Sequence, residues 1–278
     1  MSRTPRITTR NATFQQWQAL LTNRTKRQRA GEFLVQGVRP ISLAVEHDWE
    51  IRTLLVSDRG GLSRWARDLT QASDAPRALV AAELMAELGG KDEEAPEVLA
   101  VVGLPDDDLG RIPVRAQSLI VVFDRPATPG NIGTLIRSAD AFGAGGFIVT
   151  GHAADPYDPR SVRASTGSLF ALPVVRVPSH REVLDWAGAA GVRMRVVGTD
   201  ERGPGDIGED DLTGPTILAV GNEPHGLSAA WREACDAMVR IPITGAASSL
   251  NAAAAGTVAL YEAARQRRFA ASRPASAS

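Results

Sequence analysis

The sequence predicts an α/β fold in which a mostly parallel sheet carries helices on both faces, preceded by a smaller α/β domain. Two patterns indicate this class. Short apolar runs rich in β-branched residues alternate with stretches whose apolar residues recur at helical spacing, as in βαβ units. The runs in the second half are nearly continuous, which is typical of strands buried on both faces. A length of 278 residues accommodates two domains.

Charge and cysteine content limit the class of protein. The 31 Lys and Arg residues balance 32 Asp and Glu residues, so the net charge of -1 does not by itself indicate a polyanionic partner. Cys235 is the single cysteine, which excludes an internal disulfide and a Cys-rich metal site. No run of 18 apolar residues and no apolar leader occurs. We expect a cytoplasmic protein with no membrane segment and no metal.

Residues 1–28 are predicted to form a basic arm. Seven basic residues and no acidic residue occur in residues 1–30. Two interpretations stay open, a solvated tail or a segment that binds RNA phosphates. The candidate RNA-binding residues are Arg3, Arg6, Arg10, Arg24, Lys26, Arg27 and Arg29.

A small α/β domain is expected over residues 29–104, and a polar, Pro-containing linker over 105–114. The elements expected in this domain are strands at 32–37 and 51–57 and helices over 39–48, around Trp65 and around Met85.

Residues 115–268 are predicted to form the larger domain. Its expected strands lie at 119–124, 147–151, 194–200, 216–221 and 238–243. The acidic, Gly-rich stretch 200–211 is expected to be a surface loop without chemistry. Residues 269–278 are rich in Ala and Ser and are expected to be a disordered tail.

Three segments of this domain share a strand, a turn of small or polar residues, and a helix. Ligands of open parallel sheets bind at such places, outside the carboxyl ends of strands. In the first segment Asn131 can cap a helix from which Arg137 projects six residues later. An ordinary capped helix with a surface arginine gives the same pattern. The segment has no dinucleotide-binding or phosphate-loop signature.

The second and third segments supply glycines and short polar groups. Gly221 and Gly226 let the backbone approach a ligand closely, and Glu223 places a carboxylate beside the turn. A carboxylate that only complements a helix dipole is the simpler alternative. Ser249 and Asn251 open an Ala-rich helix that can also be read as a good helix former alone. His225, a single turn histidine, is assigned no role.

Together the three segments resemble a known enzyme family. N-x-G-x-x-x-R-x-A-x-A-F-G (131–143), G-N-E-P-H-G-L (221–227) and I-P-x-x-G-x-x-x-S-L-N (241–251) are similar to the ordered motifs of the SpoU (TrmH-like) branch of the SPOUT RNA 2′-O-ribose methyltransferases. The N-terminal half, with G-E-F-L-V-Q-G (31–37), resembles the family's small substrate-binding domain. One departure is Ala252, where the family usually has a β-branched residue.

The resemblance implies a fold and a function that residue patterns alone do not. It implies a C-terminal trefoil knot, a homodimer with cofactor sites near the subunit interface, and S-adenosylmethionine as cofactor. The chain most resembles the avilamycin-resistance type of 23S rRNA methyltransferase, which implies 2′-O-methylation of a uridine in 23S rRNA and resistance to an orthosomycin antibiotic. A tRNA 2′-O-methyltransferase and a catalytically silent RNA-binding or ribosome-assembly protein are the alternatives.

The resemblance also assigns site residues. Arg137 matches a family arginine that is sometimes taken as the general base. A guanidinium is always protonated in proteins and cannot accept a proton. We therefore expect Arg137 to bind a phosphate and to stabilise negative charge on the 2′-oxygen. The catalytic candidates are Asn131, Arg137, Glu223, Ser249 and Asn251. The cofactor-binding candidates are Thr199, Gly221, Asn222, Gly226, Ile241 and Leu250.

Overall fold

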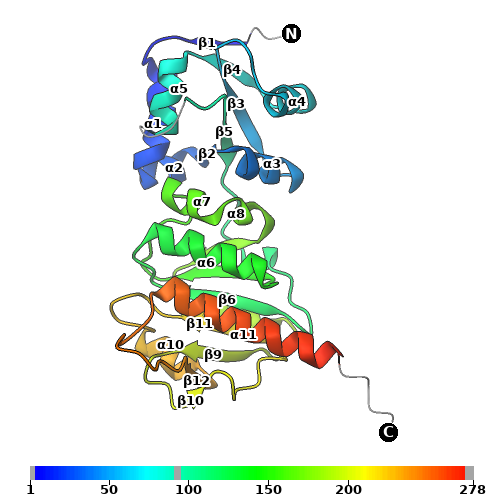
Figure 1. Ribbon diagram of the computed structural model, residues 1–278, viewed down its shortest axis with the longest axis vertical. Helices are drawn as coiled ribbons and strands as arrows, with labels where there is room; N and C mark the ends of the chain where they lie inside the picture. The colour runs from blue at the N-terminus through cyan, green and yellow to red at the C-terminus, as the bar shows by residue number, and fades with distance from the viewer. Residues whose placement is uncertain (1–3, 91–94, 273–278) are drawn as a thin grey trace. The chain divides into compact units, whose positions relative to one another are not determined.

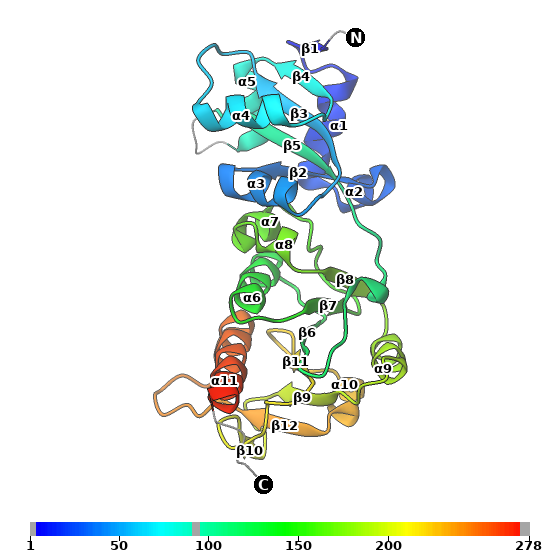
Figure 2. The same ribbon diagram turned by 90° about the vertical axis from the view of Figure 1, so that its right-hand side faces the viewer.

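The computed structural model describes residues 4–90 and 95–272, which fall into two compact units (Figures 1 and 2). Unit 1 comprises residues 1–105 and 157–171, and unit 2 comprises residues 106–156 and 172–278. The sequence predicts a first domain that starts at residue 29 and a second that runs unbroken from 115. The structure differs on both points: residues 4–28 and 157–171 lie in unit 1.

The described residues of unit 1 form a mixed five-stranded sheet of order β1-β4-β3-β5-β2 with helices. Its strands are β1 (Arg6–Ile7), β2 (Glu32–Gln36), β3 (Ile51–Ser57), β4 (Arg77–Val80) and β5 (Val98–Gly103). Its helices are α1 (Ala12–Thr22), α2 (Arg24–Ala30), α3 (Val38–Glu46), α4 (Arg64–Ala72), α5 (Ala82–Gly89), α7 (Pro159–Ser165) and α8 (Ser168–Ala171).

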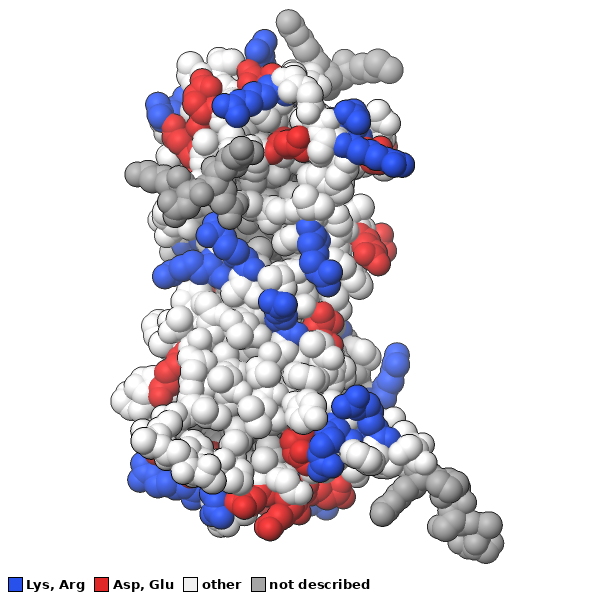
Figure 3. All heavy atoms as spheres, viewed as in Figure 1, with Lys and Arg blue, Asp and Glu red and all other residues white. Residues whose placement is uncertain are grey.

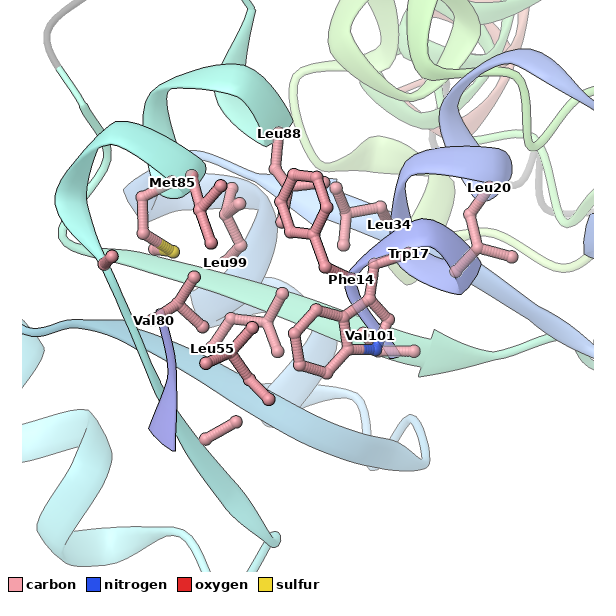
Figure 4. Packing of buried hydrophobic residues seen from close by; sticks show 14 residues of the cluster. Phe14, Trp17, Leu20, Leu34, Leu55, Val80, Met85, Leu88, Leu99 and Val101 are labelled. Atoms are coloured by element: carbon pink, nitrogen blue, oxygen red, sulfur yellow. The ribbon is translucent and has the colours of Figure 1, made fainter. Parts of the chain in front are cut away.

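The predicted basic arm is folded over its described part. Asn11 caps α1 by accepting a hydrogen bond from the backbone N–H of Phe14. Phe14, Trp17 and Leu20 are buried in the core of unit 1, where Figure 4 shows them packed with side chains from the sheet and α5. Burial of two aromatic side chains is a large stabilising contribution, which explains why this basic segment is not a solvated tail.

Three of the arm's candidate phosphate-binding residues make ion pairs or hydrogen bonds within unit 1. Arg6 pairs with Asp58, and Arg10 pairs with Glu87. Arg27 is 2% exposed, donates to the backbone carbonyl of Leu20 at 2.7 Å and lies 3.7 Å from an oxygen of Asp158. The prediction that Arg27 binds RNA is wrong, because its guanidinium is buried on protein acceptors. Arg24, Lys26 and Arg29 are exposed, and Arg3 lies outside the described residues.

Residues 157–171 pack on unit 1 through aromatic contacts and backbone acceptors. Ring centroids of Phe33 and Tyr157 are 5.0 Å apart, and those of Trp49 and Phe170 are 5.1 Å apart. The indole N–H of Trp49 also donates to the carbonyl of Phe170 at 3.0 Å. At Gly167, whose φ is +101°, an added Cβ would lie 2.5 Å from a methyl of Leu43. The backbone therefore approaches α3 closely at this turn.

Unit 2 contains the larger sheet. Its strands are β6 (Leu119–Asp124), β7 (Gly146–Thr150), β8 (Val174–Val177), β9 (Arg195–Thr199), β10 (Gly205–Asp206), β11 (Thr216–Val220) and β12 (Ala237–Arg240). Its helices are α6 (Pro129–Ala141), α9 (His180–Ala189), α10 (Ala229–Ala234) and α11 (Ala252–Ser272), with a 3-10 turn, η1 (Leu109–Arg111).

The sheet of unit 2 has the order β10-β12-β9-β11-β6-β7-β8, and each adjacent pair is parallel. Helices α6 and α11 lie side by side on one face, and α9 and α10 cover the other (Figures 1 and 2). The predicted α/β fold with a mostly parallel sheet and helices on both faces is confirmed. The chain runs outward from β6 to β8 and then resumes on the other side at β9, which creates a switch point beside β6.

Some elements end at residues other than those predicted from the sequence. The strand predicted over 238–243 ends at Arg240, because Pro242 cannot donate to a neighbouring strand. Helix α11 continues to Ser272, so residues 269–272 of the expected disordered tail are helical, and 273–278 lie outside the described residues. Ile112, in the expected linker, belongs to the core of unit 2. The trefoil knot stays a prediction.

None of the helices formed by residues 4–90 and 95–272 combines the length and apolar character needed to cross a bilayer.

Candidate active site

A cavity of about 360 Å³ opens in unit 2 at the carboxyl ends of β9, β11 and β12. All six cofactor-binding candidates of the sequence line it, namely Thr199, Gly221, Asn222, Gly226, Ile241 and Leu250. Of the catalytic candidates, Glu223 and Ser249 line it as well. Its volume falls in the range of cavities that hold small molecules, roughly 300 to 1,000 Å³. Two of the three motif segments thus meet in one cavity directly.

The 221–226 turn is built for a close approach of two backbone stretches. Asn222 and Gly226 exchange backbone hydrogen bonds of 3.1 and 3.0 Å, and Gly226 has a φ of +63°. A Cβ on Gly221 would lie 2.1 Å from the carbonyl carbon of Gly226, so no side chain fits there. The Asn222 side chain further accepts from the backbone N–H of His225 at 2.9 Å. This turn therefore presents largely main chain to the cavity, with N–H and C=O groups beside it.

The first and third motif segments join the cavity through a chain of side-chain hydrogen bonds. Asn131, near the start of α6, donates to an oxygen of Glu223 at 2.5 Å. Asn251 donates to the carbonyl oxygen of the Asn131 side chain at 3.2 Å. The other oxygen of Glu223 accepts from the backbone N–H of Ala127 at 3.3 Å. Asn131 and Asn251 therefore hold the carboxylate of Glu223 in one orientation at the cavity edge.

Asn251 has a second function as the cap of α11. Its side-chain oxygen accepts from the backbone N–H groups of Ala253 and Ala254 at 3.0 and 3.2 Å. The amide nitrogen is thereby aimed at Asn131. Residues 241–251, which lead into α11, are exposed or half-buried and contain no helix or strand. Within this stretch Ile241, Ile243 and Leu250 give the cavity an apolar side.

Charged residues at the end of β9 also line the cavity and were not among the sequence candidates. Asp200 follows Thr199 directly and pairs with Arg232, and its other oxygen accepts from the backbone N–H of Arg202 at 2.8 Å. The sequence carries a signal for Asp200, since this residue directly follows the candidate Thr199 at the end of the strand predicted over 194–200. It also begins the 200–211 stretch, for which the sequence predicts a loop without chemistry. His225, also left without a role, lines the cavity too.

Arg137 does not line the cavity. It is exposed on α6, six residues beyond Asn131, and its guanidinium has no ion pair or hydrogen bond among the described residues. The neighbouring Ser138 bonds the hydroxyl of Thr257 on α11 at 2.7 Å. Arg137 therefore borders the face that α6 and α11 present together, apart from the cavity of its own chain.

Cys235 lies behind the cavity wall, against β9. A Cβ on Gly198 would lie 2.7 Å from its sulfur, so the thiol fills the space that this glycine leaves. Burial raises the pKa of Cys235 to about 11, with Asp236 adding to the shift. The thiol is protonated at neutral pH and is a packing group there. The described residues contain no cluster of three or more His, Cys, Asp or Glu that could hold a metal ion.

Two family models match the chain. Residues 11–100 match the SpoU L30e-like domain, and residues 118–261 match the SpoU rRNA Methylase family. The first match includes α1 and α2, in agreement with their place in unit 1.

Three of the similar proteins illustrate the likeness. The chain is 62% identical over 271 residues to a 23S rRNA (uridine(2479)-2′-O)-methyltransferase of Streptomyces viridochromogenes, covering 95% of this chain and 94% of the relative. The crystal structure of the SpoU methyltransferase AviRb of that organism, in complex with AdoMet, matches 93% of this chain and 99% of its own with a TM-score of 0.90 and 62% identity. An AdoMet-bound rRNA methyltransferase of Sinorhizobium meliloti matches with a TM-score of 0.84 and 30% identity over 95% of this chain and 98% of its own.

Proposed function

The chain belongs to the SpoU rRNA methylase family and is an S-adenosylmethionine-dependent RNA methyltransferase, and we propose that it methylates the 2′-hydroxyl of a uridine in 23S rRNA. The observation that carries the proposal is the likeness in sequence, over nearly the whole chain, to a relative named for this reaction. The cavity and the Asn251–Asn131–Glu223 chain of hydrogen bonds supply the machinery such a reaction needs.

The cavity suits S-adenosylmethionine by its shape and its donor set. The backbone of the 221–226 turn offers N–H and C=O groups that can recognise an adenine edge, and the apolar side chains of Ile241 and Leu250 can pack on its ring. The carboxylates of Asp200 and Glu223 line the same cavity, where they would accept hydrogen bonds from hydroxyl or ammonium groups of the cofactor. The residues that would hold the cofactor are Thr199, Gly221, Asn222, Gly226, Ile241 and Leu250.

When bound, the cofactor supplies an electrophilic methyl group next to a positive sulfur. Glu223, held in one orientation by Asn131, would bind polar groups of the cofactor and so keep the reacting groups in one geometry. Asn251 supports Asn131 and fixes the start of α11. Ser249 offers a hydroxyl from the third motif segment at the cavity wall.

Arg137 acts on the RNA. Its guanidinium is the right group to bind the phosphate next to the target ribose and to stabilise negative charge on the 2′-oxygen, while a nucleotide phosphate or water accepts the proton. Since Arg137 lies apart from the cavity of its own chain, we infer that it completes the site of a second copy.

A homodimer through α6 and α11 provides that arrangement. Val258 and Tyr261 on α11 are 40% and 48% exposed, and Tyr261 stacks edge-on against Phe142 at the end of α6. Figure 3 shows few charged side chains over α6 and the first half of α11, whereas charged side chains gather over the C-terminal half of α11. An exposed apolar face of this kind is characteristic of a protein interface, and symmetric dimers are the commonest assemblies.

Mixed dimers test the shared site. A dimer of an Arg137→Ala chain with a Glu223→Ala chain retains one intact site if Arg137 serves the partner's cavity, so mixing two inactive variants restores up to about half of the activity of one dimer. Activity that stays at zero after verified subunit exchange contradicts a shared site. Sedimentation of the wild type as a monomer contradicts the dimer itself.

The reaction is tested on rRNA. Primer extension at low nucleotide concentration on 23S rRNA treated with protein and S-adenosylmethionine should give one new stop, and mass spectrometry should place the methyl group on the ribose of a uridine. A base-methylated product, or methylation of tRNA alone, contradicts the proposal. Because the proposed target is rRNA, we expect the methylation to take place in the bacterial cytoplasm. By the same likeness we expect expression of the gene to raise the tolerated concentration of an orthosomycin antibiotic.

A further inference from the structure

Behind the 221–228 segment lies a buried polar cluster that the chemistry above does not use. It consists of Asp124 and Arg125 at the end of β6, Thr150 at the end of β7, and Trp231 of α10. Asp124 is 3% exposed, and Thr150 and Trp231 are 1% exposed each. A buried carboxylate is costly unless its oxygens are matched by donors, so the placement of those donors indicates what the cluster holds in place.

The donors to Asp124 come from β7, from the 221–228 segment and from the neighbouring Arg125. One oxygen accepts from the hydroxyl of Thr150 at 3.2 Å, and that hydroxyl accepts from the indole N–H of Trp231 at 3.2 Å. The second oxygen accepts from the backbone N–H of Ser228 at 2.8 Å and from Nε of Arg125 at 3.1 Å. Asp124 thereby fixes the end of the segment that begins at Gly221.

Arg125 fixes the middle of the same segment. Its Nη2 donates to the carbonyl of Gly226 at 3.2 Å, and its own carbonyl accepts from the side chain of Asn222 at 3.3 Å. Asn222 and Gly226 are the two residues whose backbone pairing closes the turn. The end of β6 therefore holds both sides of the turn through hydrogen bonds.

The backbone at Arg125 has a strained conformation. Arg125 has a φ of +50°, in the left-handed region that residues other than glycine adopt at a cost in free energy. Gly151, with a φ of +70°, makes room for it, since a Cβ there would lie 2.7 Å from Cγ of Arg125. A glycine at 125 would suit the backbone better, but it could not reach the carbonyl of Gly226.

We propose that Asp124 and Arg125 are positioning residues that hold the 221–228 segment in its cofactor-binding shape. This inference rests on the proposed function, because it assumes that the cavity beside this segment takes S-adenosylmethionine. The two residues act through the segment and contact no substrate.

The test is the affinity of Arg125→Gly for S-adenosylmethionine, measured by calorimetry at a temperature where circular dichroism shows the variant fully folded. Kd should rise about tenfold, as expected for the loss of a charge-assisted hydrogen bond to the turn. KM for the cofactor should rise by more than kcat falls. A variant that is only less stable binds normally once it is folded, so a Kd within twofold of wild type overturns the proposal.

Two further variants and a control sharpen the result. Asp124→Asn can keep its oxygen toward Ser228 and Arg125 and donate its new amide to Thr150, so it should bind nearly as wild type, whereas Asp124→Ala should not. Equal binding by these two variants counts against the proposal. Arg193→Gly removes an arginine from an exposed loop and should leave Kd unchanged. A wild-type protein that fails to bind the cofactor overturns the proposed function itself.

Discussion

The side-chain amide of Asn131 donates to the carboxylate of Glu223 at 2.5 Å, although 92 residues separate the two in the sequence. Asn131 stands near the start of α6 and Glu223 in the turn after β11, and β11 is the direct neighbour of β6 in the sheet. Two parallel strands that end at the same edge therefore bring the first two motif segments into contact.

Breaking this contact should lower catalysis without unfolding the protein. Asn131→Ala leaves the Glu223 carboxylate without its side-chain donor, and we expect kcat/KM to fall by about tenfold to a hundredfold, the range typical of a hydrogen bond to a charged group. Steady-state methylation of an rRNA fragment measures it. Asp185→Ala, at an exposed position of α9 on the other face of the sheet, is the control and should behave as wild type. A similar loss in both variants would mean that the loss is not specific to the contact between Asn131 and Glu223.

Arg137→Ala should abolish methylation while S-adenosylmethionine binding persists, because Arg137 lies away from the cavity of its chain. Calorimetry and a single-turnover assay separate the two effects. Arg137→Lys keeps the charge but not the two-pronged geometry, and should recover only part of the rate. Normal turnover by Arg137→Ala defeats the assignment.

Gly221→Ala should prevent cofactor binding. Its Cβ would lie 2.1 Å from the carbonyl carbon of Gly226 and 2.2 Å from the nitrogen of Leu227, so the turn must open. We expect the variant to fold and to lose measurable heat of binding. Gly208→Ala, where an added Cβ meets nothing within 4 Å, is the control and should bind normally. Wild-type affinity in Gly221→Ala would show that the turn does not shape the cavity.

Cys235 should react slowly with iodoacetamide at pH 8.5 in the folded protein and quickly after unfolding in urea. Burial raises its pKa to about 11 from an ordinary value of 9.0, so the reactive thiolate is scarce in the folded state at that pH. Because the folded pKa is the higher one, the thiol's contribution to stability is full below pH 9 and is lost as the pH rises toward 11. Equal rates in the two states would contradict the burial of the thiol.

The basic residues of the N-terminal segment should divide into two classes. Arg27→Ala should lower the free energy of unfolding by about 2 to 4 kcal/mol, since it removes a buried charge from its acceptors. Lys26→Ala and Arg29→Ala, at exposed positions, should leave stability unchanged and each reduce the slope of log affinity for rRNA against log salt by about 1. Chemical denaturation and filter binding at several salt concentrations measure the two effects. An unchanged salt slope would show that this surface does not contact RNA.

The sequence alone determined the class of fold, and its resemblance to a known family assigned the cofactor-binding residues that line the cavity. Continuous apolar runs such as 119–124 and 216–220 are strands because only a sheet covered on both faces buries them, and both were predicted within a residue of their observed ends. Glycines after a strand predicted a close backbone approach, which the geometry at Gly221 bears out. Strand burial and the close approach at a glycine both involve short segments of the chain, so local sequence patterns can predict them.

Long-range packing decided the rest. The sequence predicts a basic arm over residues 1–28 because charge is visible in a sequence, whereas the pocket that buries Phe14 and Trp17 exists only once β2, β3 and α5 are assembled. The place of 157–171 in unit 1, the burial of Arg27 and the separation of Arg137 from the cavity likewise depend on which segments meet in space. A residue's neighbours within a few positions fix its backbone, but its solvent exposure and its partners are set by chain segments that can be a hundred residues away.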